Sequence, residues 1–104
     1  MVVEHNFEQV HTEHAVLDIG QDIGALVIYT GAVQRREEIE VSLKGLDGKR
    51  VHTAVLERRF NGNTFFAALF MSLSAGDYTI WKDDTHPGGA VTIVGGRVAE
   101  VDWR

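Results

Sequence analysis

Short apolar runs separated by glycines and polar residues make up most of the chain. They are rich in Val, Ile, Thr, Phe and Tyr, which is typical of β-strands. The runs are Ala15–Ile19, Ala25–Thr30, Glu38–Leu43, Arg50–Arg58, Thr64–Met71, Tyr78–Lys82, Ala90–Val94 and Val98–Trp103. They predict an all-β fold, an immunoglobulin-like or prealbumin-like sandwich of seven or eight antiparallel strands.

Alternation within the runs supports strands over helices. In Glu38–Leu43, Ile39, Val41 and Leu43 point to one side, whereas the interleaved Glu38, Glu40 and Ser42 point to solvent. The near-continuous apolar run Thr64–Leu73 also fits a buried helix, but the preceding Asn61-Gly62-Asn63 favours a hairpin turn. We interpret the polar run Gln34–Glu38 as a solvated connection, although one helical turn fits it too.

Two further hairpins are predicted from turn residues. Asp47-Gly48 indicates that Glu38–Leu43 and Arg50–Arg58 pair antiparallel, with Gly48 accepting a positive φ. At the C-terminal end, a loop of Gly95 and Gly96 alone would place Val91 opposite Glu100 and mix apolar with charged groups.

A three-residue loop, Gly95-Gly96-Arg97, gives a better match. It places Ile93 opposite Ala99 and Val91 opposite Val101, with Trp103 continuing the same apolar face. Register decides which face is buried, so the second pairing predicts a hairpin with one apolar and one polar side.

The segment Leu73–Trp81, LSAGDYTIW, together with Val91–Val101 resembles the closing part of carboxypeptidase-regulatory and prealbumin-like sandwich modules. The resemblance implies that Tyr78 forms a tyrosine corner, with its ring buried and its hydroxyl bonded to nearby backbone. Val16–Val27 and Gly96–Trp103 are also similar to a set of short uncharacterised bacterial proteins, some of which are labelled phospholipase. This likeness implies a fold and a bacterial source.

Composition then limits the function. The 104 residues are 44% hydrophobic, enough for one core, so we expect one domain over residues 15–104 preceded by a flexible polar arm, residues 1–14. Without cysteine there is no disulfide, thiolate metal site or cysteine nucleophile. A net charge of −5 with scattered basic residues argues against nucleic acid, and no apolar run is long enough for a signal peptide or a membrane span. These features predict a cytoplasmic protein.

Two groups of residues are candidates for chemistry. In the arm, His11 and His14 form an H-x-x-H pair that would share one face of a helical turn and bind zinc or nickel. In the loop before the proline, Asp83 and Asp84 would bind calcium, or Asp84 would orient His86 as a base. The alternatives are a solvated polar arm and a turn built from favoured turn residues.

Other patterns carry structure more readily than chemistry. The stretch Asp18–Gly24 holds two acids and two glycines that would line a small site or form a turn. None of the three serines, Ser42, Ser72 and Ser74, lies in a nucleophile elbow. The neighbours Phe65 and Phe66 must face opposite sides of a strand, and an exposed ring there would mark a sugar platform or a dimer interface.

Three functions remain. The leading hypothesis is a non-enzymatic binding or interaction module that engages a protein partner or a second copy of itself as a homodimer. The second is a metal-binding accessory protein that uses the arm, and the third is a small hydrolase with its site at Asp83–His86.

Overall fold

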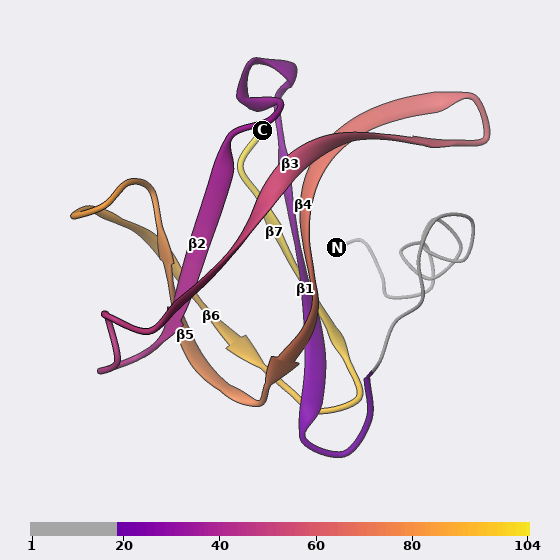
Figure 1. The fold of residues 1–104 in the computed structure, drawn as a ribbon. Coiled ribbons are helices and arrows are strands. Elements are labelled where there is room, and N and C mark those ends of the chain that lie inside the picture. The colour runs from indigo at the N-terminus through magenta and orange to yellow at the C-terminus, as the bar shows by residue number, and fades with distance from the viewer. Residues whose placement is uncertain (1–18) are drawn as a thin grey trace.

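The computed structural model describes residues 19–104, which form seven strands and one short 3-10 helix. The elements are β1 (Ile23–Thr30), η1 (Ala32–Gln34), β2 (Glu38–Leu43), β3 (Arg50–Phe60), β4 (Asn63–Ser74), β5 (Gly76–Trp81), β6 (Pro87–Ile93) and β7 (Val98–Asp102). They form one nearly closed, barrel-like sheet in the order β6-β5-β2-β3-β4-β1-β7 (Figure 1). The all-β prediction is confirmed, but the sheet is mixed, because β1 and β7 are parallel.

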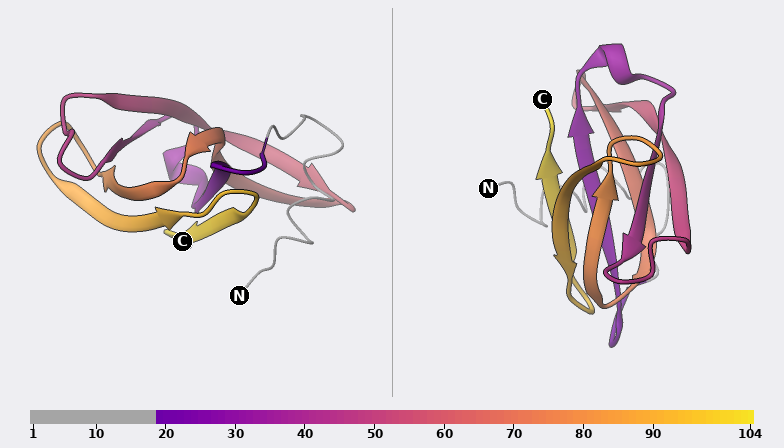
Figure 2. Two further views of the ribbon diagram at one scale, coloured as in Figure 1. Left: turned by 90° about the horizontal axis from the view of Figure 1, so that it is seen from below. Right: turned by 90° about the vertical axis from the view of Figure 1, so that its left-hand side faces the viewer.

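The long strand β3 bends the sheet. Its first part, Arg50–Ala54, pairs with β2, and its second part, Val55–Phe60, pairs with β4. The single sheet thereby has two opposite sides, here called layers, one of β6, β5 and β2 and one of β4, β1 and β7, which are continuous through β3 (Figure 2). The two ends of the sheet, β6 and β7, therefore come to the same side of the molecule and leave a seam between them.

The main core lies between the layers. Leu26 and Ile28 of β1 meet Val41 of β2 and Ile80 of β5, and all four are fully buried. The alternation predicted for β2 is confirmed at Ile39 and Val41. The solvent position predicted for Ser42 is wrong: its exposed fraction is 1%, because the Trp81 indole covers it and donates a hydrogen bond to its hydroxyl at 2.9 Å.

The β3–β4 hairpin is confirmed in detail. Asn61 and Gly62 both have positive φ, 52° and 78°, as a two-residue type I′ turn requires, and Phe60 pairs with Asn63 across it. The run after the turn is therefore a strand and not a helix. Phe65 and Phe66 do face opposite sides: Phe66 packs on the main core and Phe65 on the outer face of β4.

For the β2–β3 connection, the predicted strand pairing is confirmed, but the predicted turn residue is wrong. The strands pair antiparallel as predicted. The left-handed residue of the loop is Gly45, with φ of 88°, and not Gly48. The polar run before β2 starts with the single turn η1 and continues as an exposed connection.

The predicted C-terminal hairpin is wrong. β6 pairs with β5, and β7 pairs in parallel with β1. The Gly95-Gly96 turn crosses between the layers, and Gly96 N donates to the Ile23 carbonyl at 2.9 Å. A Cβ at Gly95 would overlap the carbonyl oxygen of Gln21, so this crossing needs glycine.

The predicted apolar face of this segment is nevertheless correct. Ile93 belongs to the main core, and Val91, Ala99, Val101 and Trp103 pack against it. A strand's alternation fixes which side chains face inward whichever strand lies beside it, so the face was readable although the pairing was not.

Tyr78 makes the contacts that the resemblance of its segment implied. Its ring is buried, and its hydroxyl donates to the Ser74 carbonyl at 2.7 Å. Burial of the ring raises the pKa of its hydroxyl above the usual value. This local tie fixes the start of β5 against the end of β4.

Residues 1–18 lie outside the described part of the chain, and with them most of the predicted strand Ala15–Ile19 and the arm. In the stretch that follows, Gly20 and Ile23 exchange backbone hydrogen bonds around a tight turn at Gln21 and Asp22. The turn interpretation of this segment is therefore confirmed. Over residues 19–104, no helix has the length and apolar character needed to cross a membrane.

Candidate functional site

A cleft of about 620 Å³ opens beside Trp103, the residue that follows β7. Its lining residues are far apart in the sequence: Gln34, Glu37, Glu38, Ile39, Lys82, Pro87, Gly88 and Trp103. This volume is within the range of small-ligand sites, which often occur at the mouths of β-barrels. The cleft is larger than a neighbouring hollow of about 200 Å³.

Backbone contacts position the walls of the cleft. Trp103 N donates to the Tyr29 carbonyl at 2.7 Å, which holds the indole at the end of β7. Across the seam, Gly88 lies against this ring: a Cβ at Gly88 would be 3.1 Å from Cζ2 of Trp103. On the far wall, Ile39 is buried and marks the entry of β2 into the core. The cleft therefore has a rigid aromatic side at the sheet ends and a polar side at the start of β2.

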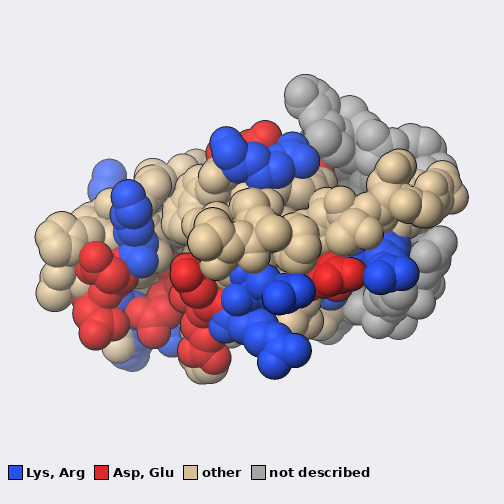
Figure 3. Space-filling view, turned by 90° about the horizontal axis from the view of Figure 1, so that it is seen from above, with Lys and Arg blue, Asp and Glu red and all other residues tan. Residues whose placement is uncertain are grey.

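The polar side is acidic. Glu37 and Glu38 line the cleft together with a single lysine, Lys82. A smaller hollow of about 200 Å³ shares Glu38 and Lys82 with the cleft and adds the carboxylates of Glu40, Asp83 and Asp84. Figure 3 views the molecule from above and shows acidic side chains gathered on one side of it. The local field favours a cationic group.

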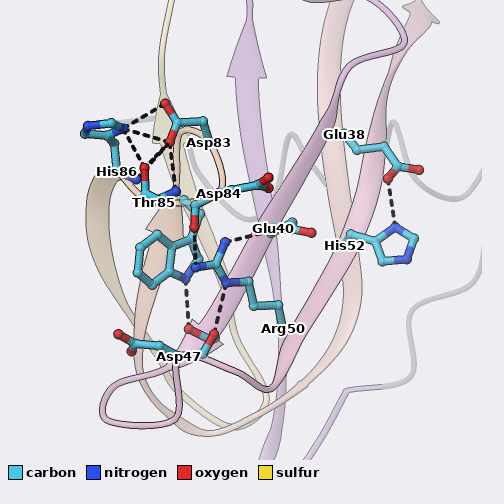
Figure 4. A network of polar contacts seen from close by, with 11 residues as sticks. Glu38, Glu40, Asp47, Arg50, His52, Asp83, Asp84, Thr85 and His86 are labelled. Atoms are coloured by element: carbon cyan, nitrogen blue, oxygen red, sulfur yellow. Dashed lines mark hydrogen bonds and ion pairs between the residues drawn. The ribbon is translucent and has the colours of Figure 1, made fainter.

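Arg50 fixes the loops beside the hollow (Figure 4). Its guanidinium stacks on the Trp81 ring at 3.7 Å from the centroid, and Nη1 donates to Glu40 Oε1 at 2.9 Å. Nε donates to the Asp47 carbonyl at 3.0 Å and Nη2 to the Asp84 carbonyl at 2.9 Å. One side chain thus ties the β2–β3 loop to the β5–β6 loop, and these contacts leave its charge compensated.

Asp83 organises the β5–β6 loop. Its Oδ1 accepts hydrogen bonds from the backbone N–H of Thr85 and of His86, both at 2.9 Å, and lies 2.8 Å from Nδ1 of His86. These contacts, the Thr85 N–H foremost, lower the pKa of Asp83 to about 2. Both side chains are exposed, by 57% for Asp83 and 74% for His86.

The candidate residues from the sequence are only partly brought together. Asp83, and not Asp84, contacts His86. The Asp84 carbonyl accepts a hydrogen bond from Arg50, and Asp84 helps line the hollow. The predicted role of Asp84 in orienting His86 is therefore wrong in geometry. His11 and His14 lie outside the described residues. Within residues 19–104, no three His, Cys, Asp or Glu side chains are placed to hold one metal ion.

The cleft itself was not found from the sequence. Trp103 was predicted to continue the apolar face of the last strand, and Glu37 and Glu38 to be part of a solvated connection. Their convergence depends on β7 crossing to β1, which brings the C-terminal indole to the β1–β2 end. The sequence signal was a tryptophan that directly follows the alternating strand β7.

Comparison with known proteins assigns no family. No protein-family model matches the chain, and no curated protein matches it. Among solved structures, it is similar to part of a leucine-rich repeat protein from Bacteroides thetaiotaomicron, with 20% sequence identity and a TM-score of 0.48. The match covers 80% of this chain and 12% of that protein, so it spans about an eighth of the larger chain.

Proposed function

We propose that the domain is a non-enzymatic binding module that takes a basic side chain of a protein partner into the cleft beside Trp103. The observation that carries the proposal is the cleft itself, which sets an indole opposite Glu37 and Glu38. Aromatic rings and carboxylates together favour an arginine or lysine side chain, through cation–π attraction and charge-assisted hydrogen bonds.

The unpaired edges of the two terminal strands are a second reason to expect a polypeptide as the partner. β6 and β7 each have one edge without a strand partner among the described residues, and both edges flank the seam that leads to the cleft. Unpaired edges accept extended segments by backbone hydrogen bonding, while a nearby pocket selects one side chain. Pro87, the first residue of β6, has no backbone N–H to donate, so pairing with a partner strand would start beyond it.

The two other functions have less support from the geometry. For a hydrolase, His86 with Asp83 is an exposed pair that lines neither the cleft nor the hollow as a unit. Ser42 is buried under Trp81, away from that pair. For a metal-binding protein, the histidines concerned, His11 and His14, lie in residues 1–18. Neither function supplies an argument as direct as the cleft.

A capped tripeptide series provides the test. N-acetyl-Gly-Arg-Gly-amide is titrated into the protein and followed through the indole NMR signal of Trp103, with the Leu and Glu peptides as controls. We expect saturable shifts with the Arg peptide alone. The double variant Glu37→Gln/Glu38→Gln should weaken binding by about tenfold, since each lost charge contact of this kind contributes about 0.5–1 kcal/mol.

Glu57→Gln is the matched control variant. Glu57 is a carboxylate on β3 that lines neither the cleft nor the hollow, so its loss should leave peptide binding unchanged. Equal binding of the Leu or Glu peptide, or shifts that spare Trp103, would contradict the proposal.

We also propose that the barrel is a closed variant of the prealbumin-like sandwich. The tyrosine corner at Tyr78 and the two layers joined through β3 support this relation. Parallel pairing of β1 with β7 is the feature to compare in solved sandwich modules.

A further inference from the structure

The outer face of the β4–β1–β7 layer is apolar and buried. Val27 of β1 and Ala67 of β4 have exposed fractions of 0%, and Ala25 of 1%, although all three point away from the main core. Among residues 19–104, their cluster contains only other side chains of this same face, with one exception, Ile19. A sheet face buried in this way needs a cover, as in strands that lie between two layers.

The turn before β1 indicates where the cover comes from. Gly20 N donates to the Ile23 carbonyl at 2.9 Å and Ile23 N to the Gly20 carbonyl at 2.8 Å, so the chain reverses direction there. Ile19 and Gly20 therefore lead into β1 through a reversal at Gln21 and Asp22. Both edges of β1 are already paired, with β4 and β7, so β1 offers no open edge to a further strand. Ile19, which precedes β1, already packs against this outer face.

We propose that this outer face is the docking surface for residues 1–18 of the same chain. Eighteen residues span up to about 60 Å when extended, against about 26 Å for the eight residues of β1. The segment carries Val10, Val16 and Leu17, side chains suited to Val27 and Ala67.

The rim of the face also matches the segment. Arg58 lies opposite Phe65 on this face, and its Nε is buried without a hydrogen-bond acceptor among the described residues. Leaving a buried donor unpaired is unfavourable, and residues 1–18 contain Glu4, Glu8 and Glu13 as acceptors.

Covalent connection favours this occupant over a second copy. A segment joined directly to Ile19 is present at an effective concentration in the millimolar range. A second chain would have to reach that concentration in solution to compete. The occupant is therefore intramolecular at the micromolar concentrations of an ordinary assay.

The test is methyl NMR on the full chain. We expect nuclear Overhauser contacts between the methyl groups of Leu17 and those of Val27 or Ala67 in a dilute, monomeric sample. Leu17→Asp should expose the face and raise the fluorescence of an added apolar dye such as ANS several-fold. Val33→Asp is the control, because Val33 is 88% exposed on η1 and lies off this face.

Two results would overturn the proposal. One is the absence of contacts from residues 1–18 to the face in the wild-type protein. The other is contacts that arise only between differently labelled chains, with a mass that rises with concentration, which would make a second copy the occupant. A Leu17→Asp variant that fails to fold does not decide the matter, because the wild-type contacts alone answer it.

Discussion

The two layers of the sheet bury their strands in different ways. In the β4–β1–β7 layer, β1 is buried at five consecutive positions, Gly24–Ile28, so both of its faces are covered. In the β6–β5–β2 layer, β6 is exposed at its first four positions, Pro87–Ala90, and only its end enters the core. The first layer is held by apolar contact on both sides. The second has one solvated side, and there polar ties position the loops around the cleft.

A charge placed in each layer should show the largest difference. Val27→Asp would bury a carboxylate next to Glu100 on β7, and we expect a loss of about 3–5 kcal/mol in the free energy of unfolding. Ala90→Asp on the exposed part of β6 should change it by no more than about 0.5 kcal/mol. Urea denaturation of both variants gives the comparison. Similar losses would mean that the two layers are buried alike.

Removal of the Arg50 side chain tests the polar ties of the second layer. Arg50→Ala deletes the stacking on Trp81 and the bonds to Glu40, Asp47 and Asp84, and we expect a loss of about 2 kcal/mol. The matched control is Arg59→Ala, whose side chain is 76% exposed and bonds only to Glu57 among its described partners, with an expected change below about 0.5 kcal/mol. Thermal unfolding measures both. If Arg59→Ala costs as much, the network around Arg50 is not what holds these loops.

The smallest effect is expected in the Asp83 loop and depends on pH. Because the folded pKa of Asp83 is depressed to about 2, its carboxylate favours the folded loop above its ordinary pKa of 3.8 and loses that effect as the pH falls through about 2. The amide signals of Thr85 and His86 should therefore titrate with a midpoint near 2. Asp83→Asn keeps an acceptor oxygen and should remove this titration. A midpoint near 3.8 in the wild-type protein would show that the loop bonds are absent in solution.

Local sequence patterns predicted most strands because they depend on neighbours in the chain. Asn61-Gly62 specified the β3–β4 hairpin through positive φ, and the alternation at Ile39 and Val41 specified the inner face of β2. The loop at Asp83–His86 was located, but the residue that contacts His86 was misassigned. Which carboxylate in a short loop turns back to its own backbone depends on backbone dihedrals that residue types alone leave open.

The cleft was beyond sequence reasoning because its residues meet only through long-range pairing. Trp103 is separated from Glu37 by most of the chain, and the two lie in one cleft only because β7 joins β1. The Gly95-Gly96 pair looked like a hairpin turn, and a glycine pair suits a crossing equally well. The sequence contains no local signal that separates these uses.

Spacing along single strands was enough to predict an all-β domain, the positions of most of its strands and the sides that face inward. The parallel pairing of β7 with β1, the near closure of the sheet into a barrel and the acidic cleft beside Trp103 arise only from long-range contacts in the folded chain. Strand partners are chosen by the packing of the whole core, and any strand with the right inward face satisfies the local pattern.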